Sequence, residues 1–584
     1  MKYSSIPSAR SVVYHCKARG IRNIIISPGS RNAPLTLSFS EDPFFKCFSI
    51  VDERCAAFFA LGIAQQLGEP TVILCTSGSA LLNYYPAVAE AFYSDIPIIV
   101  ISADRPTYKV DIGDGQTIRQ ENVFQNHIGY SANLKQDVCH ATDRIRKYDP
   151  DQLTHIGLDQ SQNLVQKYND AELDKALSMA FSNATPVHIN IPFEEPLYGT
   201  VDSSGPIPEV NFTQVQEKGG GEEGQDYLET WQNASRKMIL VGVNPPNIVE
   251  QRYLEILAND PSVIVLTEST SNLFHPHFFP NIDSIIAPIE KSGNKDELFK
   301  KLQPEIVLTF GGLIVSKKIK AFLREYSPLQ HWHVDVKKAN DTFFCLTKHF
   351  KTYPNDFFKY LLDGSSSMQS GYYAYWAGKK VQYKLRRKEY LEQIAFSDMW
   401  VFHNVLDSVP KNYQLQLSNS STVRYAQLFD LDPSISVFCN RGTSGIDGST
   451  STALGASIYD SNPTLLVTGD LSFLYDSNAL WNNYIKPNFR IIVINNNGGG
   501  IFRILPGKED SNNFNTFFET THNIDIRSLA EMYKFGFESV SNKLDLKNAF
   551  VDFYKESEKP KILEIKTPRL LNDKILLSYF DFIS

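Results

Sequence analysis

Two short polar segments in the C-terminal third of the 584-residue chain have the composition of a metal site. GDLS begins at Gly469 and follows the apolar run TLLVT, and NNNGGG spans 495–500 and follows RIIVI. The carboxylate of Asp470, an asparagine oxygen and a nearby backbone carbonyl are hard oxygen ligands. Mg²⁺ prefers such ligands and keeps other positions for water and phosphates. These residues therefore predict a site for Mg²⁺ and a diphosphate.

The glycines beside these ligands support the same interpretation. Gly498–Gly500 let the backbone approach a ligand closely. The segment Gly469–Ser472 leads into an expected helix, whose N-terminus attracts phosphate. The alternative is a tight turn with capping side chains. The carboxylate of Asp470 favours the metal site over that alternative.

The elements that must position these residues are short apolar runs separated by helix-like stretches. Such runs occur in all three thirds of the chain, as NIIIS, TVILC and PIIVI, then KMILV, SVIVL and EIVLT, then TLLVT and RIIVI. Continuous hydrophobicity rich in β-branched residues predicts strands covered on both faces. Alternation with helices predicts an α/β fold class of three doubly wound parallel-sheet domains. In such sheets, ligands bind beyond the carboxyl ends of the strands.

Two polar stretches predict linkers between these domains. They span 199–226, which is rich in Gly and Pro, and 363–371, a Ser/Gly tract. The expected domains are therefore 1–198, 199–362 and 363–584.

The first and third domains match each other at one fixed offset. Ala60-Leu61-Gly62 recurs as Ala453-Leu454-Gly455, an offset of 393 residues (453 − 60), and Ile98–Ile101 recurs as Ile491–Ile494 at the same offset. We interpret this as two copies of one α/β unit. General similarity between any two such units is the alternative.

Composition limits the classes of function. The formal net charge of -8 argues weakly against a sequence-independent nucleic-acid binder. Seven cysteines without a CxxC pair give no indication of a zinc site. The N-terminus lacks the apolar core of a signal peptide, and no apolar run approaches the ~20 residues that span a bilayer. A cytoplasmic protein is expected, with no nucleic-acid or membrane partner.

GDLS, with NN beginning 25 residues after Asp470, resembles the cofactor motif of thiamine diphosphate-dependent enzymes. The resemblance implies thiamine diphosphate held through Mg²⁺ or Mn²⁺, with Asp470, Asn496 and the Gly498 carbonyl as metal ligands. It also implies pyrimidine-binding and diphosphate-binding domains at the two ends of the chain. The cofactor contacts that it implies are Glu53, Ile446, Gly469, Asp470, Leu471 and Ser472. By itself, Glu53 would be read as an acid favoured at a helix N-terminus.

Further motifs resemble one branch of this family, the transferases of menaquinone biosynthesis that join 2-oxoglutarate to isochorismate with loss of CO₂. The motifs are SPGSRNAPLTLSF, DERCAAFFALG, SADRP, GQTIRQ, NRGTSGIDGSTSTALG and GDLSFLYDSNAL with NNNGGGIF. The resemblance implies catalytic roles for Glu53, Gln116, Arg31 and Ser30. The substrate contacts that it implies are Ser30, Arg31, Arg105, Gln116, Lys317, Lys318, Ser420, Arg424, Arg441, Ile501 and Phe502.

The charges agree with this chemistry. Both substrates are dianions, and arginine is the preferred partner of carboxylates because it binds them through two parallel hydrogen bonds. Each arginine alone could equally form a structural ion pair. Lys317-Lys318 stands where this branch often has Lys-Arg, and a solvated lysine run is the alternative there.

Other enzymes remain as alternatives. A 2-oxo acid decarboxylase or an acetolactate synthase-like carboligase shares Glu53 and Asp470 but processes monoanions. A dinucleotide-dependent oxidoreductase is disfavoured because the chain has no GxGxxG, and a binding module leaves the acid, metal and cation sets unexplained. The resemblance implies a homodimer or homotetramer in which Glu53 of one subunit meets Asp470 of another.

Overall fold

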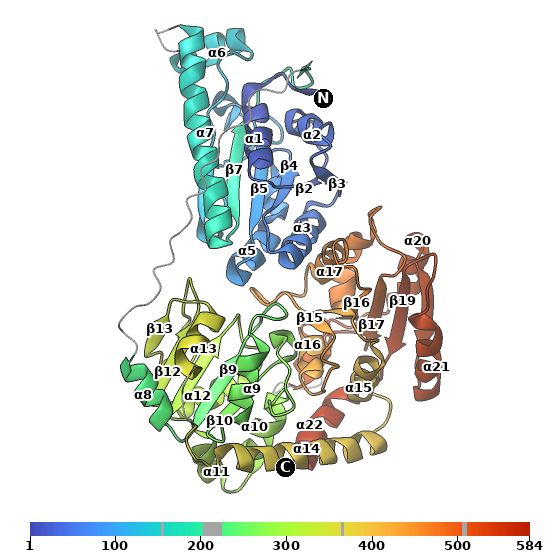
Figure 1. The fold of residues 1–584 in the computed structure, drawn as a ribbon. Coiled ribbons are helices and arrows are strands. Elements are labelled where there is room, and N and C mark those ends of the chain that lie inside the picture. Colours follow the sequence, from blue (N-terminus) through green and yellow to red (C-terminus); the bar gives the residue numbers. More distant parts are fainter. Residues whose placement is uncertain (154–156, 203–224, 364–366, 505–510) are drawn as a thin grey trace. The chain divides into compact units, whose positions relative to one another are not determined.

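The computed structural model of the protein describes residues 1–153, 157–202, 225–363, 367–504 and 511–584 (Figure 1). The described residues form two compact units. The first contains the residues up to 202 together with Gly442–Ser461 and Asp476–Lys486, and the second contains the rest. Most of the predicted linker 199–226, and residues 364–366 of the second linker, lie outside the described residues.

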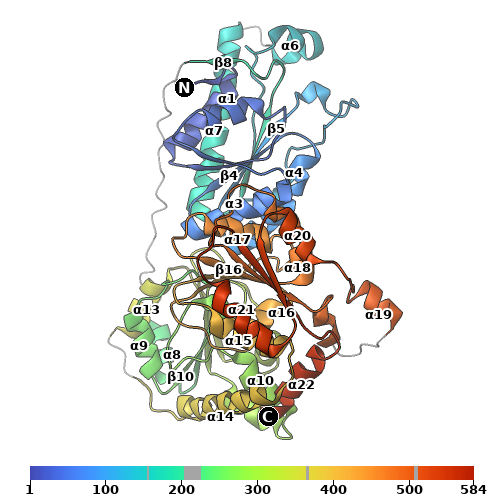
Figure 2. The same cartoon turned by 90° about the vertical axis from the view of Figure 1, so that its right-hand side faces the viewer.

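The first unit is built on a six-stranded parallel sheet with helices on both faces (Figures 1 and 2). Its strand order is β3 (Lys46–Ser49), β2 (Asn23–Ile26), β4 (Thr71–Cys75), β5 (Ile98–Asp104), β7 (Val187–Pro192), β6 (Tyr130–Asn133). The helices of this unit are α1 (Pro7–Ala18), α2 (Ala33–Ser40), α3 (Glu53–Leu67), α4 (Ser79–Asn83), α5 (Tyr85–Ser94), α6 (Thr142–Tyr148), α7 (Leu158–Asn183) and α17 (Ser449–Ser457). A short antiparallel pair, β1 (Tyr3–Ser4) with β8 (Thr200–Val201), completes it.

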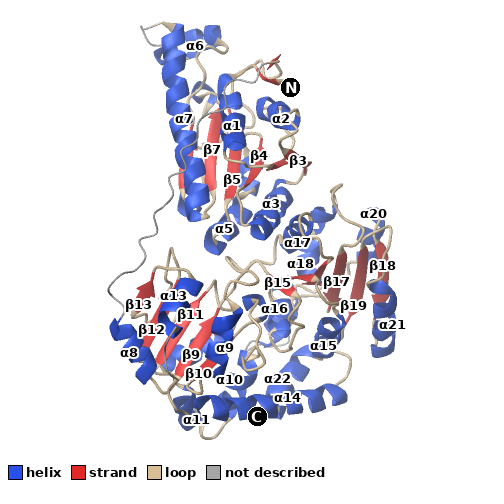
Figure 3. Cartoon of the chain, in the orientation of Figure 1, coloured by secondary structure: helices blue, strands red, loops and turns tan. Residues whose placement is uncertain are grey.

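The second unit contains two further parallel sheets, shown in red in Figure 3. The order in one is β10 (Val263–Leu266), β9 (Lys237–Val241), β11 (Ile306–Phe310), β12 (Gln330–Val334), β13 (Lys348–Phe350). The order in the other is β15 (Ser436–Phe438), β14 (Gln414–Leu417), β16 (Thr464–Gly469), β17 (Arg490–Asn495), β19 (Lys561–Lys566), β18 (Gly536–Val540). The predicted α/β class with parallel sheets is confirmed, while the domain boundaries stay a prediction.

Helices surround these two sheets. Those of the five-stranded sheet are α8 (Gln225–Asn233), α9 (Gln251–Asn259), α10 (Ile282–Lys291), α11 (Lys295–Leu302), α12 (Lys317–Glu325) and α13 (Pro354–Leu362), followed by the long α14 (Tyr372–Gln393). Those of the six-stranded sheet are α15 (Asp398–Ser408), α16 (Ser421–Ala426), α18 (Asp470–Tyr475), α19 (Asn512–Phe517), α20 (Ile526–Met532), α21 (Lys543–Phe553) and α22 (Asn572–Phe582). In the part of the chain that the structure describes, no helix is both long and apolar enough to cross a membrane.

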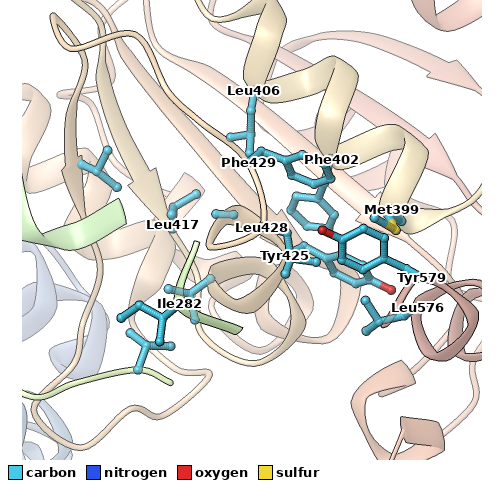
Figure 4. Close-up of a cluster of buried hydrophobic side chains, with 14 of the residues drawn as sticks. Ile282, Met399, Phe402, Leu406, Leu417, Tyr425, Leu428, Phe429, Leu576 and Tyr579 are labelled. Carbon is cyan, nitrogen blue, oxygen red and sulfur yellow. The ribbon is translucent and has the colours of Figure 1, made fainter. Parts of the chain in front are cut away.

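Aromatic side chains fill the core between α15, α16 and α22 (Figure 4). The rings of Phe402 and Tyr425 stack with centroids 4.9 Å apart. Tyr579 is fully buried, and its hydroxyl lies 3.0 Å from the Ser284 hydroxyl of α10. This core therefore ties the six-stranded sheet of the second unit to the helices of the five-stranded one.

The two six-stranded sheets confirm the predicted internal repeat. Their strand orders are the same when β2, β4 and β5 are matched with β14, β16 and β17. The offset of 393 residues also matches α3 with α17, and both helices lie in the first unit.

The two matched helices touch through their matched glycines. A Cβ atom on Gly62 would lie 2.1 Å from the carbonyl oxygen of Thr452, and one on Gly455 would lie 1.9 Å from that of Phe59. Phe59 and Thr452 are themselves related by the 393-residue offset (452 − 59). Each of the two helices therefore uses the same glycine to admit the same carbonyl of the other helix.

We expect Gly62→Ala and Gly455→Ala each to destabilise the protein. A methyl group cannot fit against a backbone carbonyl unless the helices separate, and overpacking of this kind costs about 1–3 kcal/mol. Gly378 provides the control, because it lies in α14 and a methyl group added there would have no atom within 4 Å. There the same substitution should be neutral or stabilise by up to about 1 kcal/mol. Urea unfolding of the three variants makes the comparison; equal effects at the three sites would contradict it.

A buried carboxylate fixes the chain beyond β7. Glu194 is 1% exposed and accepts hydrogen bonds from Lys109 Nζ at 2.8 Å and Arg144 Nη1 at 2.6 Å. The Tyr108 hydroxyl also donates to it. Burial acts to raise the pKa of Glu194, but the hydrogen bonds from Lys109 and Tyr108 outweigh burial and lower it to about 2. Glu194 is therefore ionised in the folded protein and holds two cations together.

We expect Glu194→Gln to lower the free energy of unfolding by about 3 kcal/mol at neutral pH, because it removes a buried charge that pairs with the half-buried Lys109 and with Arg144. The folded pKa lies below the unfolded value of 4.5, so this stabilisation is complete above pH 4.5 and is lost as the pH falls toward 2. Denaturant unfolding between pH 7 and pH 3 should show the two proteins converging in acid. Asp143→Asn, at an exposed pair with Arg146, should cost at most about 1 kcal/mol. A pH-independent difference would refute the assignment.

Candidate active site

The predicted metal ligands come together at the carboxyl ends of β16 and β17. These strands are parallel neighbours, with Gly469 beside Ile494. Asp470 is 3% exposed, and its Oδ2 accepts a hydrogen bond of 2.9 Å from the Gly498 backbone. Leu471 N donates to the other carboxylate oxygen at 2.8 Å, at the start of α18. The carboxylate is thereby fixed beside the Asn496–Gly498 turn.

Asn496 presents a buried oxygen toward this position. Its Nδ2 donates to Asp398 Oδ2 at 3.0 Å, which makes Oδ1 the free end of the amide. Among the described residues, Oδ1 has no hydrogen-bond partner although it is buried. A buried acceptor without a donor costs free energy that a cation would recover. This oxygen therefore fits a metal ligand.

Asp398 is the hydrogen-bond partner that orients the Asn496 side chain. It is 2% exposed and accepts a hydrogen bond of 2.6 Å from Thr567 Oγ1 in addition to that from Asn496. Burial, with a contribution from the Asp470 charge, raises the pKa of Asp398 to about 6. Partners of this kind orient metal ligands.

The backbone carbonyl of Gly498 is the third predicted oxygen ligand of the metal. Its φ is +151°, and a Cβ there would lie 2.7 Å from the Glu519 carbonyl oxygen, so only glycine fits. Its own carbonyl accepts a hydrogen bond of 3.0 Å from Gly500 N and retains a second lone pair. His522 Nε2 lies 3.2 Å from Asp470 Oδ2. A carboxylate beside a turn that carries an amide oxygen and a carbonyl fits Mg²⁺ or Mn²⁺ and a diphosphate.

Glu53 occupies the first turn of α3, in the first unit. Asp52 caps this helix by accepting a hydrogen bond of 3.1 Å from Cys55 N. Glu53 lines a cavity of about 500 Å³ together with Pro28, Asn83, Trp481 and neighbouring residues. Burial, with the nearby charge of Glu53, raises the pKa of Cys75 and of Tyr84. Ile446 lies in the same unit and is exposed.

Two of the predicted arginines of the first unit lie close together. Arg31 is 4% exposed and donates to the Phe193 carbonyl at 3.0 Å and to Glu195 Oε1 at 3.2 Å. Its Nε is buried and has no hydrogen-bond partner among the described residues. Burial lowers the pKa of Arg31, and Arg105 adds to that effect. Arg105 donates to the Gly115 carbonyl at 3.0 Å. Glu195 pairs with one side of the Arg31 guanidinium, and the positive charge of Arg105 lies near it.

The polar residues predicted beside them are open to solvent. Ser30 and Gln116 are exposed, and Gln116 has a φ of +57°. A left-handed residue other than glycine stores about 1–3 kcal/mol of strain, which is common at functional sites.

A second cation group lies in the second unit. Ser420 directly precedes α16 and has a φ of +67°, and its carbonyl accepts a hydrogen bond of 2.7 Å from Arg424 Nη1. Arg441 is 9% exposed and donates to Asn419 Oδ1 at 2.7 Å. Burial lowers the pKa of Arg424, and the charge of Arg441 lowers it further. The structure therefore brings these two predicted arginines together.

The two predicted lysines begin α12 but differ in their surroundings. Lys317 is exposed, whereas Lys318 forms an ion pair with Glu290. Ile501 and Phe502 are half-buried, and the Phe502 ring lies 6.2 Å from that of Phe518. The roles of all four residues stay predictions.

Sequence reasoning missed three buried residues of these sites. Gln120 donates to Ser102, Ala103 and Asn190 and accepts from Gly78 N at 2.9 Å, so it organises the loop that carries Gln116. Its place in the GQTIRQ motif was the available signal. No local pattern marked Asp398, since its partners are distant in sequence. Glu268 forms a local capping box with Ser271, but the backbone groups of Val315 and Ser316 that it also binds are distant.

Comparison with known proteins agrees with this geometry. Residues 8–132 match the family model "Thiamine pyrophosphate enzyme, N-terminal TPP binding domain", and residues 420–565 match the corresponding C-terminal TPP binding domain. These ranges contain Glu53 and Asp470, respectively.

Full-length relatives identify the branch of the family to which the chain belongs. A protein of Christiangramia forsetii is 54% identical over 584 residues, which cover 100% of both chains. One of Flavobacterium johnsoniae is 52% identical, with 99% of each chain covered, and one of Porphyromonas gingivalis is 36% identical, with 97% of this chain and 95% of the relative covered. All three are named 2-succinyl-5-enolpyruvyl-6-hydroxy-3-cyclohexene-1-carboxylate synthase. The predicted resemblance is confirmed: the chain belongs to the thiamine pyrophosphate enzymes and, among them, to the 2-succinyl-5-enolpyruvyl-6-hydroxy-3-cyclohexene-1-carboxylate synthase family.

Proposed function

We propose that the protein uses thiamine diphosphate and Mg²⁺ or Mn²⁺ to join 2-oxoglutarate to isochorismate in menaquinone biosynthesis. One CO₂ leaves 2-oxoglutarate, and a new carbon–carbon bond joins the remaining four-carbon unit to the isochorismate ring. The product is 2-succinyl-5-enolpyruvyl-6-hydroxy-3-cyclohexene-1-carboxylate, the compound in the name of the relatives.

The cofactor supplies the electron sink for loss of CO₂, and the protein supplies binding and orientation. Asp470, Asn496 and the Gly498 carbonyl would hold the cation, and the Asn496 oxygen without a partner supports this assignment. Glu53 would hydrogen-bond the pyrimidine ring, and Ile446 would support the cofactor. Residues 469, 471 and 472 would line the diphosphate.

The observation that carries the choice of substrates is that each unit places a buried arginine beside a half-buried one. Arg31 lies near Arg105, and Arg424 lies near Arg441. Burying like charges next to each other is unfavourable unless an anion binds between them. Two dianionic substrates require such pairs, whereas a monoanionic 2-oxo acid requires fewer cations. Ser30, Gln116 and Ser420 would add neutral hydrogen bonds.

The test combines purified protein, Mg²⁺, thiamine diphosphate, 2-oxoglutarate and isochorismate, with each component omitted in turn. We expect the joined product, identified by mass spectrometry, only in the complete mixture. Release of CO₂ with succinic semialdehyde as the sole product, whether isochorismate is present or absent, would instead identify a simple 2-oxo acid decarboxylase.

The proposal includes the arrangement of the chain. Residues 1–198 would bind the pyrimidine, 363–584 the diphosphate, and 199–362 would form the central domain. The protein would be a cytoplasmic homodimer or homotetramer with active sites between subunits. Each site would then contain Glu53 of one subunit and Asp470 of another.

We expect Asp470→Ala to abolish cofactor binding at micromolar thiamine diphosphate, because it removes the anionic ligand of the cation. Asp398→Asn should weaken binding by about 10- to 100-fold, as loss of a ligand's outer partner does. Glu556→Ala removes the same charge from an exposed site and should change nothing. Calorimetric titration with Mg²⁺ and thiamine diphosphate, with circular dichroism to verify folding, makes the measurement. Unchanged affinity in Asp470→Ala would refute the metal assignment.

We expect the inactive variants Glu53→Gln and Asp470→Ala to complement each other when unfolded and refolded together. In a mixed dimer, one shared site carries both changes and the other carries neither, so activity should recover to about a quarter of wild type. Each variant refolded alone is the control. Absence of recovery, despite mixed dimers detected by native mass spectrometry, would mean that each site lies within one chain.

A further inference from the structure

The first turn of α12 carries three lysines that do not all lie on one face. Ser316 caps the helix by accepting a hydrogen bond of 3.2 Å from Ile319 N, so Lys317 is the first helical residue. Residues three apart share a face of a helix, whereas adjacent residues differ by about 100°. Lys317 and Lys320 therefore lie on one face, and Lys318 lies off it.

Lys318 already has partners. Its ammonium forms an ion pair with Glu290 of α10, and it lies 5.7 Å from the centre of the Phe580 ring of α22. Both side chains of the ion pair are about one-third exposed, at 31% and 33%. Lys318 therefore joins three helices of the second unit, and a substrate carboxylate would have to compete with Glu290 for it.

Lys320 is in the opposite situation. It is half-buried, and among the described residues it makes no ion pair and no side-chain hydrogen bond. Burial lowers the pKa of Lys320; Glu268 opposes this effect, whereas Arg441 and Lys317 add to it. Among the described residues, this half-buried ammonium has the charge of Glu268 near it but no direct partner, and it lies beside Lys317 and Arg441, a predicted substrate contact. A bound anion would therefore stabilise it.

The carboxylates near Lys320 already accept hydrogen bonds from other groups. Glu268 accepts hydrogen bonds of 2.8 Å from the backbone N–H groups of both Val315 and Ser316, and Asp283 accepts one from the Ser316 hydroxyl. Burial raises the pKa of Glu268 to about 7 and also raises that of Asp283. The negative charge on these two carboxylates is thus reduced. It is smaller than the positive charge of the nearby cations Lys317, Lys320, Arg424 and Arg441.

We propose that Lys320, rather than Lys318, is the second lysine that binds a substrate carboxylate, together with Lys317 and Arg441. This inference rests on the proposed function and identifies a residue that the resemblance did not. Lys318 instead holds α12 against α10 and α22.

Steady-state kinetics of the holoenzyme with both substrates tests the proposal. Lys320→Met should raise the KM of one dicarboxylate substrate by about 10- to 100-fold, the equivalent of one charge-assisted hydrogen bond. The other KM should change by less than about threefold, and the melting temperature should be unchanged. Lys320→Arg should restore most of the lost affinity. Lys318→Met should have a smaller effect on the same KM but should lower the melting temperature. Lys547→Met, at an exposed site of α21, is the neutral control.

The outcomes are distinct. If the wild type forms no joined product, the proposed function fails before Lys320 is tested. If the wild type is active and Lys320→Met leaves both KM values unchanged, or raises both equally with a loss of stability, the inference is overturned. It is also overturned if Lys318→Met, and not Lys320→Met, separates the two KM values. Should Lys320→Met not fold, Lys320→Gln makes the same comparison.

Discussion

The parallel pairing of β16 with β17 is the interaction on which the proposed site depends. Five successive residues, Leu465–Gly469, pair with Arg490–Ile494. This ladder forces Asp470 and Asn496 to leave the sheet at the same edge. Because both strands are covered on both faces, polar side chains can lie only at their ends. In the first unit, the ladder between β4 and β5 likewise ends near Gly78 and Arg105.

Electrostatics explains why a protein with a net charge of -8 can bind dianions. The acidic residues near the proposed sites already have partners within the protein. Glu194 binds Lys109 and Arg144, and Glu268 accepts backbone hydrogen bonds at the start of α12. The buried Arg31 keeps one donor, its Nε, without a hydrogen-bond partner among the described residues. The local charge therefore differs in sign from the overall charge, and it acts in surroundings where solvent screens it poorly.

Much of the fold and of the candidate metal site was predictable from the sequence. Continuous apolar runs marked the strands, since burial on both faces leaves no polar positions. The repeat and the Asp470, Asn496 and Gly498 set were visible because each is encoded in adjacent residues. Asp398 and Gln120 were not, because they act through partners 98 and 70 residues away. Lys320 gave no local signal because the charges of Glu268 and Arg441 that surround it come from other parts of the chain. Lys318 and Lys320 could not be distinguished before the position of Glu290 was known.

The contact between α3 and α17 also fixes, within one chain, the spacing of two residues that are proposed to bind the cofactor. Glu53 begins α3, and Ile446 stands three residues before Ser449, the first residue of α17. The two helices meet at Gly62 and Gly455 through peptide groups, which have no rotamers to exchange. Side-chain repacking in the surrounding cores therefore cannot be transmitted through this contact as a change in spacing. The separation of Glu53 and Ile446 behaves as a fixed dimension of the backbone, while the hydrophobic cores on either side are free to vary in composition.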